Sequence, residues 1–206
     1  MGANYVAFPY SKKNPMFTQG SWLNPPEKQA LHASELHVTT NAHTDFWRKT
    51  QYGFIRDSGH FFGVPADGDF TAQIHVAAQY SSLYDQAGLM VRIDEKNWIK
   101  CGIEFSDGEL LLSSVLTVDN SDWSVSVAPT MTEGFWLRVT VAAGVIRVQY
   151  STDGKRWPLL RLAPFPIAAR YLVGPMCCTP ERGGLEVVFS QFSCGPALQK
   201  DLHDLS

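Results

Sequence analysis

Residues 98–112 read WIKCGIEFSDGELLL, and this stretch decides the fold of the 206-residue chain. Polar and apolar residues alternate up to Phe105, and an apolar run follows Glu109. An Asp-Gly pair between two such segments, here Asp107-Gly108, is a strong signal of a two-residue hairpin turn. The turn sets the register of the two strands. It pairs Ser106 with Glu109, and therefore Glu104 with Leu111, Gly102 with Ser113 and Lys100 with Val115.

The same period of two recurs along the chain, interrupted by Gly, Pro, Asn or Asp about every ten residues. This pattern is typical of an antiparallel sandwich or barrel, so the sequence predicts an all-β fold. Short helical turns are expected at Pro26–His32 and from Ala197 onward. No repeat or linker divides the chain, which predicts one domain over residues 1–206 with a core at about 20–195 and an extension at each end. The expected strands are Glu35–Thr40, Asp69–Tyr80, Gln86–Ile93, Asn97–Phe105, Leu110–Val118, Asp122–Ala128, Phe135–Ala142, Val145–Ser151, Leu159–Leu162, Tyr171–Cys177 and Leu185–Ser193.

The composition excludes several functional classes. With 17 Lys and Arg against 20 Asp and Glu, and a net charge of -3, the chain lacks the basic surface of a nucleic-acid-binding protein. It has no apolar run of about 20 residues for a membrane helix and no apolar segment of a secretion signal near its start. We therefore expect a cytoplasmic protein that contacts neither nucleic acid nor membrane, with its four cysteines as free thiols.

Unusual side chains occupy the positions that alternate with the core. The connection at Asp94-Glu95-Lys96 favours a second hairpin that sets Arg92 opposite Trp98, Met90 opposite Lys100 and Gln86 opposite Glu104. An ordinary solvated sheet face carries few large aromatic side chains, whereas sugars are bound by planar polar groups beside an aromatic ring. We therefore expect one sheet face to bind a glycan or small polar ligand through Gln73, His75, Gln86, Arg92, Trp98, Lys100, Glu104, Trp136 and Arg138.

Five runs carry a resemblance to a known family. They are Thr44–Thr50 with Tyr52–Phe54, Asp57–His60, Tyr84–Met90, Trp98–Phe105 and Ser121–Val125. Over about residues 20–195 the chain resembles the regulation of enolase protein 1 family, a group within the concanavalin A-like lectin/glucanase superfamily. The resemblance implies a jelly-roll sandwich of two curved antiparallel sheets, whose concave face in the wider superfamily binds or cleaves sugars. It implies no established reaction.

Glu104 is the one candidate catalytic residue on this face. A retaining glycosidase needs two carboxyl groups about 5–5.5 Å apart, and the same-face neighbours of Glu104 are Gly102 and Ser106. Asp85 and Asp122 are possible second carboxylates, but the sequence places neither beside Glu104. His60 with Asp57, before a short strand at Phe61–Phe62, is a further candidate base, although a capping turn is the preferred explanation of the pair. Neither metal-ligand spacing nor a cofactor motif is present, so we expect no metal and no cofactor.

Three hypotheses follow. The preferred one is a non-enzymatic, lectin-like domain that binds a glycan or small polar ligand on its concave face and regulates carbohydrate metabolism. The second is an interaction module that acts through a metabolic protein partner and binds no sugar. The third is a glycosidase-like or other enzyme that uses Glu104 as its acid or base.

Overall fold

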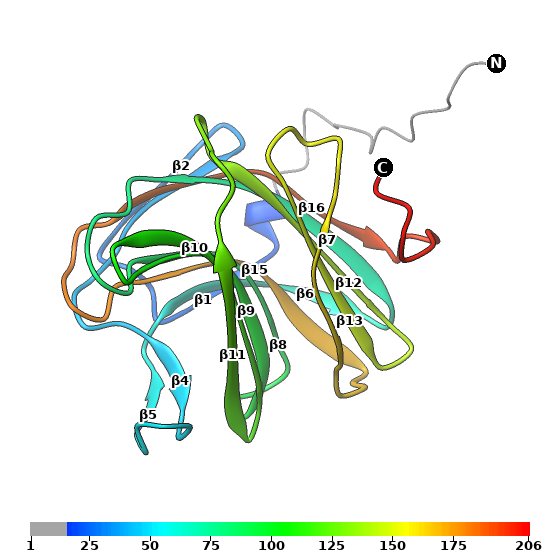
Figure 1. Ribbon diagram of the computed structural model, residues 1–206, viewed down its shortest axis with the longest axis horizontal. Helices are drawn as coiled ribbons and strands as arrows, with labels where there is room; N and C mark the ends of the chain where they lie inside the picture. The colour runs from blue at the N-terminus through cyan, green and yellow to red at the C-terminus, as the bar shows by residue number, and fades with distance from the viewer. Residues whose placement is uncertain (1–15) are drawn as a thin grey trace.

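The computed structural model describes residues 16–206 and consists of two seven-stranded antiparallel sheets packed face to face (Figure 1). This arrangement confirms the predicted sandwich. The first sheet has the order β1 (Ser21–Leu23), β6 (His60–Asp67), β15 (Arg170–Cys178), β8 (Gln86–Arg92), β9 (Asn97–Ser106), β10 (Glu109–Val118) and β11 (Asn120–Val127). The second has the order β14 (Leu159–Pro164), β13 (Val145–Ser151), β12 (Phe135–Ala142), β7 (Phe70–Ala78), β16 (Glu186–Pro196), β3 (Glu35–Thr39) and β2 (Lys28–His32).

Three further elements complete the described chain. A 3-10 helix, η1, spans Met16–Thr18. The strands β4 (Phe46–Arg48) and β5 (Ile55–Asp57) pair with each other as a small separate hairpin. In Figure 1 this β4–β5 hairpin projects from the sandwich on the side of β11.

Both predicted hairpin registers are confirmed. Glu104 pairs with Leu111 across the Asp107-Gly108 turn, and Arg92 pairs with Trp98 between β8 and β9. Asp107 has φ 55° and Gly108 has φ 81°, the left-handed values that this turn type demands at both positions. The turn chemistry therefore fixes which side chains of β9 share a face.

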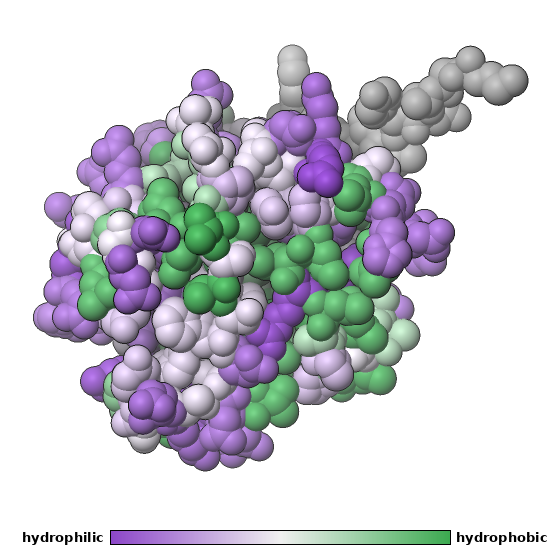
Figure 2. Space-filling view, viewed as in Figure 1, coloured by the Kyte–Doolittle hydropathy of each residue, from purple (hydrophilic) through white to green (hydrophobic). Residues whose placement is uncertain are grey.

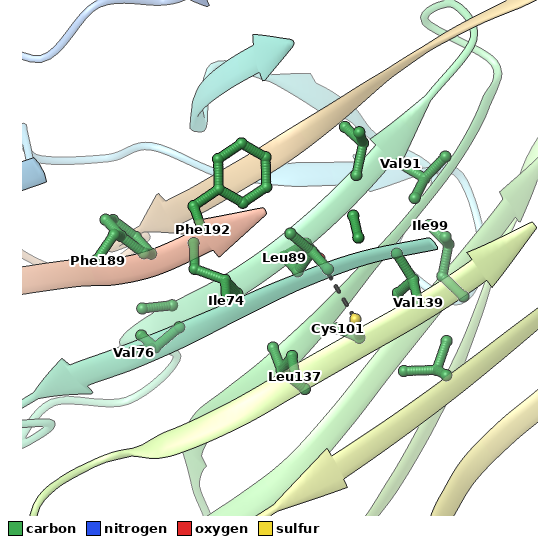
Figure 3. Close-up of a cluster of buried hydrophobic side chains, with 14 of the residues drawn as sticks. Ile74, Val76, Leu89, Val91, Ile99, Cys101, Leu137, Val139, Phe189 and Phe192 are labelled. Atoms are coloured by element: carbon green, nitrogen blue, oxygen red, sulfur yellow. Dashed lines mark hydrogen bonds between the residues drawn. The ribbon is translucent and has the colours of Figure 1, made fainter. Parts of the chain in front are cut away.

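The core lies between the two sheets. Figure 3 shows side chains from both layers meeting there, with the Cys101 thiol donating to the carbonyl of Leu89 at 3.4 Å. The core side chains alternate with the outward-facing ones along each strand, as the period of two predicts. Those labelled in Figure 3 are Ile74, Val76, Leu89, Val91, Ile99, Cys101, Leu137, Val139, Phe189 and Phe192.

Two local predictions were wrong. The expected helical turn at Pro26–His32 is largely strand β2, because Lys28–His32 pairs with β3 and gains a ladder of backbone hydrogen bonds. The expected helical turn from Ala197 is not helix: the tail lies against the outer face of the second sheet and has only a hydrogen-bonded turn, in which the Asp204 amide donates to the Asp201 carbonyl at 3.1 Å. No helix in residues 16–206 is long and apolar enough to cross a membrane.

Candidate functional site

The nine predicted ligand-binding residues divide between the two sheets. Five of them lie on β8 and β9 of the first sheet: Gln86, Arg92, Trp98, Lys100 and Glu104. The other four lie on β7 and β12 of the second sheet: Gln73, His75, Trp136 and Arg138. Because the inner faces of both sheets form the core, the two groups point to opposite sides of the sandwich. The prediction of a single shared face was therefore wrong.

The second-sheet group is engaged with its own chain. The Nε of Arg138 donates to Gln73 at 3.2 Å, and its guanidinium lies 3.7 Å from the centre of the Trp157 ring. The Nη1 of Arg138 also donates to the carbonyl of Ser206, so the C-terminal segment covers this face. Burial and the neighbouring charge of Arg147 lower the pKa of Arg138 to about 10. Arg138 therefore holds the tail against the second sheet.

A further pair from this group also has internal partners. The His75 ring lies 4.3 Å from the Trp136 ring, and its Nδ1 is hydrogen-bonded to Ser190 at 3.1 Å. Burial lowers the pKa of His75. A neutral imidazole packed on an indole is typical of a structural contact on a sheet surface.

The outer face of the first sheet, in contrast, holds a pocket of about 780 Å³. Gln86, Lys100 and Glu104 form its floor, and the loop of residues 41–60, which includes the β4–β5 hairpin, forms one wall. Trp123 on β11 and Tyr84 before β8 also line it. Ligand pockets in proteins typically span about 300–1,000 Å³, so this pocket has room for a small organic ligand.

The loop of residues 41–60 buries the remaining first-sheet residues. Trp98 is 0% exposed, and its ring lies 6.0 Å from that of Phe46 on β4. Both terminal nitrogens of the Arg92 guanidinium, Nη1 and Nη2, donate to the carboxylate of Asp57 on β5, at 2.8 and 2.9 Å. A bidentate pair of this kind fixes geometry as well as charge. Trp98 and Arg92 therefore support the hairpin and do not reach the pocket, contrary to their predicted role.

Lys100 organises the polar floor. Its ammonium donates to Gln86 Oε1 at 2.7 Å and to Asp45 Oδ1 at 3.1 Å. Burial lowers the pKa of Lys100, but the charge of Asp45 and weaker interactions with its neighbours outweigh this effect, so the pKa lies above its usual value. Lys100 is therefore a fixed cation whose charge is matched by Asp45.

Glu104 lies beside this pair and is only 4% exposed. The Ser113 hydroxyl donates to Glu104 Oε2 at 2.7 Å and itself accepts from the indole nitrogen of Trp123 at 3.1 Å. Burial raises the pKa of Glu104, and Lys100 and the hydrogen bonds offset this only in part. A carboxyl group with a raised pKa can accept or donate a hydrogen bond to a bound molecule, depending on pH.

Several pocket residues were missed by sequence reasoning. Asp45 is the carboxylate near Glu104, whereas Asp85 pairs with Arg182 and Asp122 pairs with Arg161. The other missed residues are aromatic: Trp47, Tyr52 and Phe54 on the hairpin, Tyr84 and Trp123. The aromatic content of residues 47–54 was the one signal of this wall, but no periodicity placed the loop over the sheet.

The histidine candidate does not form a catalytic pair. His60 lies at the start of β6. Its Nε2 accepts a hydrogen bond from the backbone N–H of Asn41 at 3.0 Å, and its Nδ1 lies 2.7 Å from the backbone carbonyl oxygen of Asn24. Its expected partner Asp57 binds Arg92 instead. Within residues 16–206, no three His, Cys, Asp or Glu side chains gather as the ligands of a metal ion would.

Comparison with known proteins gives both a family and a fold. The family model described as "Protein of unknown function (DUF1349)" matches residues 22–197. The chain is 58% identical over 194 residues to "Regulation of enolase protein 1" of Saccharomyces cerevisiae, covering 94% of this chain and 98% of the relative.

Two solved structures have the same fold. A crystal structure of a functionally unknown protein from Saccharomyces cerevisiae matches with a TM-score of 0.87 and 57% identity, over 88% of this chain and 98% of that one. The GH43 protein BlXynB (a K247S mutant) of Bacillus licheniformis matches with a TM-score of 0.66 and 15% identity, over 95% of this chain and 41% of that one. At such low identity the second match shows a shared fold only.

Proposed function

The chain belongs to the family described as "Protein of unknown function (DUF1349)", and from the chemistry of its first-sheet pocket we propose that it is a non-enzymatic carbohydrate-binding domain. One observation carries the proposal. Buried polar side chains with fixed hydrogen bonds, Gln86, Lys100 and Glu104, face a wall of aromatic rings across an open pocket of about 780 Å³. Few surfaces other than ligand sites combine these features.

The pocket chemistry matches that of a sugar. Sugar hydroxyl groups both donate and accept hydrogen bonds, and Asp45 and Glu104 offer carboxylate acceptors while Lys100 and Gln86 offer donors. The apolar C–H faces of a sugar ring pack on aromatic side chains, and Trp123 and Tyr52 are 37% and 54% exposed for such a contact. The two kinds of group therefore lie on opposite sides of one pocket.

The wall and floor are also held in place before any ligand arrives. The indole nitrogen of Trp47 donates to the carbonyl of Thr50 at 2.9 Å, and that of Trp123 donates to Ser113 at 3.1 Å. Because the rings and the Lys100 ammonium are already fixed, a ligand loses little free energy in ordering them. This preorganisation supports binding as the primary role.

The proposal includes a regulatory role for the sugar-binding domain in the cytoplasm. The yeast relative is named "Regulation of enolase protein 1", which supports a link to the control of carbohydrate metabolism. All four cysteines are free thiols, as expected of a protein in a reducing compartment. The regulation is exerted through a metabolic protein partner or through the ligand-bound state itself, and a fluorescent fusion of the full chain tests the compartment.

A glycan array tests the binding proposal. The full chain is expected to be retained on at least one glycan, and Glu104→Gln and Trp123→Ala are expected to abolish retention without lowering the melting temperature by more than a few degrees. Gln73→Ala, on the opposite face, is the matched control and retains binding. Failure of the wild type to bind any glycan, or equal loss with Gln73→Ala, would overturn the proposal.

A second candidate function rests on Glu104. Its raised pKa and the nearby Asp45 carboxylate are features of a general acid beside a second carboxyl group. If the domain is an enzyme, incubation with the retained glycan releases shorter products, and Glu104→Gln stops their release while preserving binding. Retention of an intact glycan supports the binding domain instead.

A further inference from the structure

A second hollow adjoins the first-sheet pocket. It has a volume of about 470 Å³ and shares three aromatic side chains with the pocket: Trp47, Tyr52 and Trp123. Its remaining lining comes from Thr50 and Gln51 at the tip of the hairpin and from Ser121 and Asp122 on β11. The shared residues therefore stand as an aromatic ridge between two sites that open on the same face.

We propose that the ligand is an uncharged linear oligosaccharide of at least two sugar units, which crosses the aromatic ridge and fills both hollows. This inference rests on the proposed function and specifies the class of sugar. A single sugar ring would occupy the polar pocket alone and leave the second hollow without a role.

Trp123 and Tyr52, 37% and 54% exposed, provide the accessible surface of the ridge, and Trp47, only 8% exposed, packs between them. Trp47 and Trp123 lie 6.5 Å apart at 86°, and the Tyr52 ring lies 5.8 Å from that of Trp47. Both indole N–H groups are engaged with protein acceptors, so the exposed parts of these rings are apolar. Figure 2 shows mainly pale side chains, of intermediate hydropathy, between the β4–β5 hairpin and β11. Such a surface suits a sugar better than a purely apolar ligand.

The second hollow supplies polar partners of its own. Ser121 lines it and shares a face of β11 with Trp123, whereas the Asp122 carboxylate points to the other face of β11 and pairs with Arg161 of β14 at 2.7 Å. The side chains of Thr50 and Gln51 are exposed at this end of the hairpin. A hydroxyl and an amide at the tip of the hairpin can bind the hydroxyl groups of a second sugar unit.

The charges around the pocket favour an uncharged ligand. Four carboxyl groups line it (Asp45, Asp57, Glu104 and Glu181), against two basic groups, Lys100 and Arg56. Lys100 is already paired with Asp45 and Asp57 with Arg92, while Arg56 lies over the Phe54 ring, so Glu104 and Glu181 are the lining carboxyl groups outside these two ion pairs. A phosphate or uronate on the ligand would meet carboxylates and no unpaired buried cation, which disfavours its binding.

Calorimetric titration of the full chain tests the inference. The probes are the monosaccharide, disaccharide and trisaccharide of the neutral glycan retained on the array, together with a trisaccharide that carries one uronic acid. Affinity is expected to rise by about tenfold or more from monosaccharide to trisaccharide, as ~1.4 kcal/mol of added contact would produce. The acidic trisaccharide is expected to bind more weakly than the neutral one.

Gln51→Ala is the variant that isolates the second hollow, because Gln51 is exposed and lines this hollow but not the first-sheet pocket. It is expected to remove most of the gain with chain length and to leave the monosaccharide affinity unchanged. Gln29→Ala is the matched control, because Gln29 is another exposed glutamine, lies on β2 of the second sheet and lines neither hollow. It is expected to change neither affinity.

Each contrary result has a separate meaning. The two-site inference would be overturned if the monosaccharide, disaccharide and trisaccharide bound with equal affinity. If Glu104→Gln still abolished that binding, the first-sheet pocket would remain the sugar site. Tighter binding of the acidic trisaccharide would overturn the uncharged ligand. Binding of none of the probes would overturn the proposed function and this inference together.

Discussion

Replacing Asp45 with Asn leaves the Lys100 ammonium without its counter-charge, and we expect the change to lower the free energy of unfolding by about 3 kcal/mol. Lys100 is 4% exposed and has Asp45 and Gln86 as its two hydrogen-bonding partners. Removal of one member of a buried ion pair costs ~3–5 kcal/mol, because the remaining charge stays out of water. The low end applies here, since Gln86 keeps its hydrogen bond and Glu104 ionises more readily without the Asp45 charge beside it.

Urea unfolding at neutral pH, followed by tryptophan fluorescence, measures this loss. The double variant Asp45→Asn with Lys100→Met removes both charges and is expected to recover much of the stability, because no unpaired charge remains buried. Asp67→Asn is the control: its pair with Arg170 is about two-thirds exposed on both sides, so water screens it and its loss is expected to leave the free energy of unfolding almost unchanged. A single variant as stable as the wild type, or a double variant no more stable than the single one, would refute the reasoning.

Three further predictions concern the elements around the pocket. Trp98→Ala is expected to lower the free energy of unfolding by about 3–5 kcal/mol, measured in urea, because the indole is fully buried under Phe46; an unchanged midpoint would contradict this packing. Asp57→Ala removes the carboxylate that Arg92 holds and is expected to speed proteolytic cleavage within residues 49–54, whereas unchanged cleavage would show that the hairpin is anchored elsewhere. Because burial raises the pKa of Glu104 in the folded state, the wild type loses stability as pH rises from about 4.5 through that pKa. The Glu104→Gln variant has no ionisable group at this position. The difference in free energy of unfolding between the wild type and this variant is therefore expected to shrink over this pH range in urea titrations. A difference that grows with pH would contradict the prediction.

Sequence reasoning succeeded where local chemistry fixes structure. The Asp107-Gly108 turn has one favoured geometry, so the register of Glu104 and Lys100 followed from the sequence alone. All eleven predicted strands are present, with ends that differ by a few residues. Strands such as β4 and β5, of three residues each, were too short to show a period.

The site was predicted only in part, for a physical reason. Alternation tells which side chains leave the core, but it does not tell which sheet a strand joins, so Arg138 and Lys100 were assigned to one face although they lie on opposite faces. Nor does it show what covers a face. The position of Trp98 in its strand predicts a side chain exposed on the outer face of the sheet. The loop of residues 41–60 instead folds over Trp98 and brings Asp45 to Lys100. Those contacts join segments about fifty residues apart, beyond the reach of any local pattern.

A crystal structure of the full chain soaked with the neutral oligosaccharide retained on the array tests the central claim most directly. The first-sheet pocket is predicted to hold the sugar, with its hydroxyl groups within hydrogen-bonding distance of Glu104 and Gln86 and a ring packed on Trp123. Sugar bound instead on the second sheet, beside His75 and Trp136, or a first-sheet pocket left empty at saturating sugar, would contradict the claim.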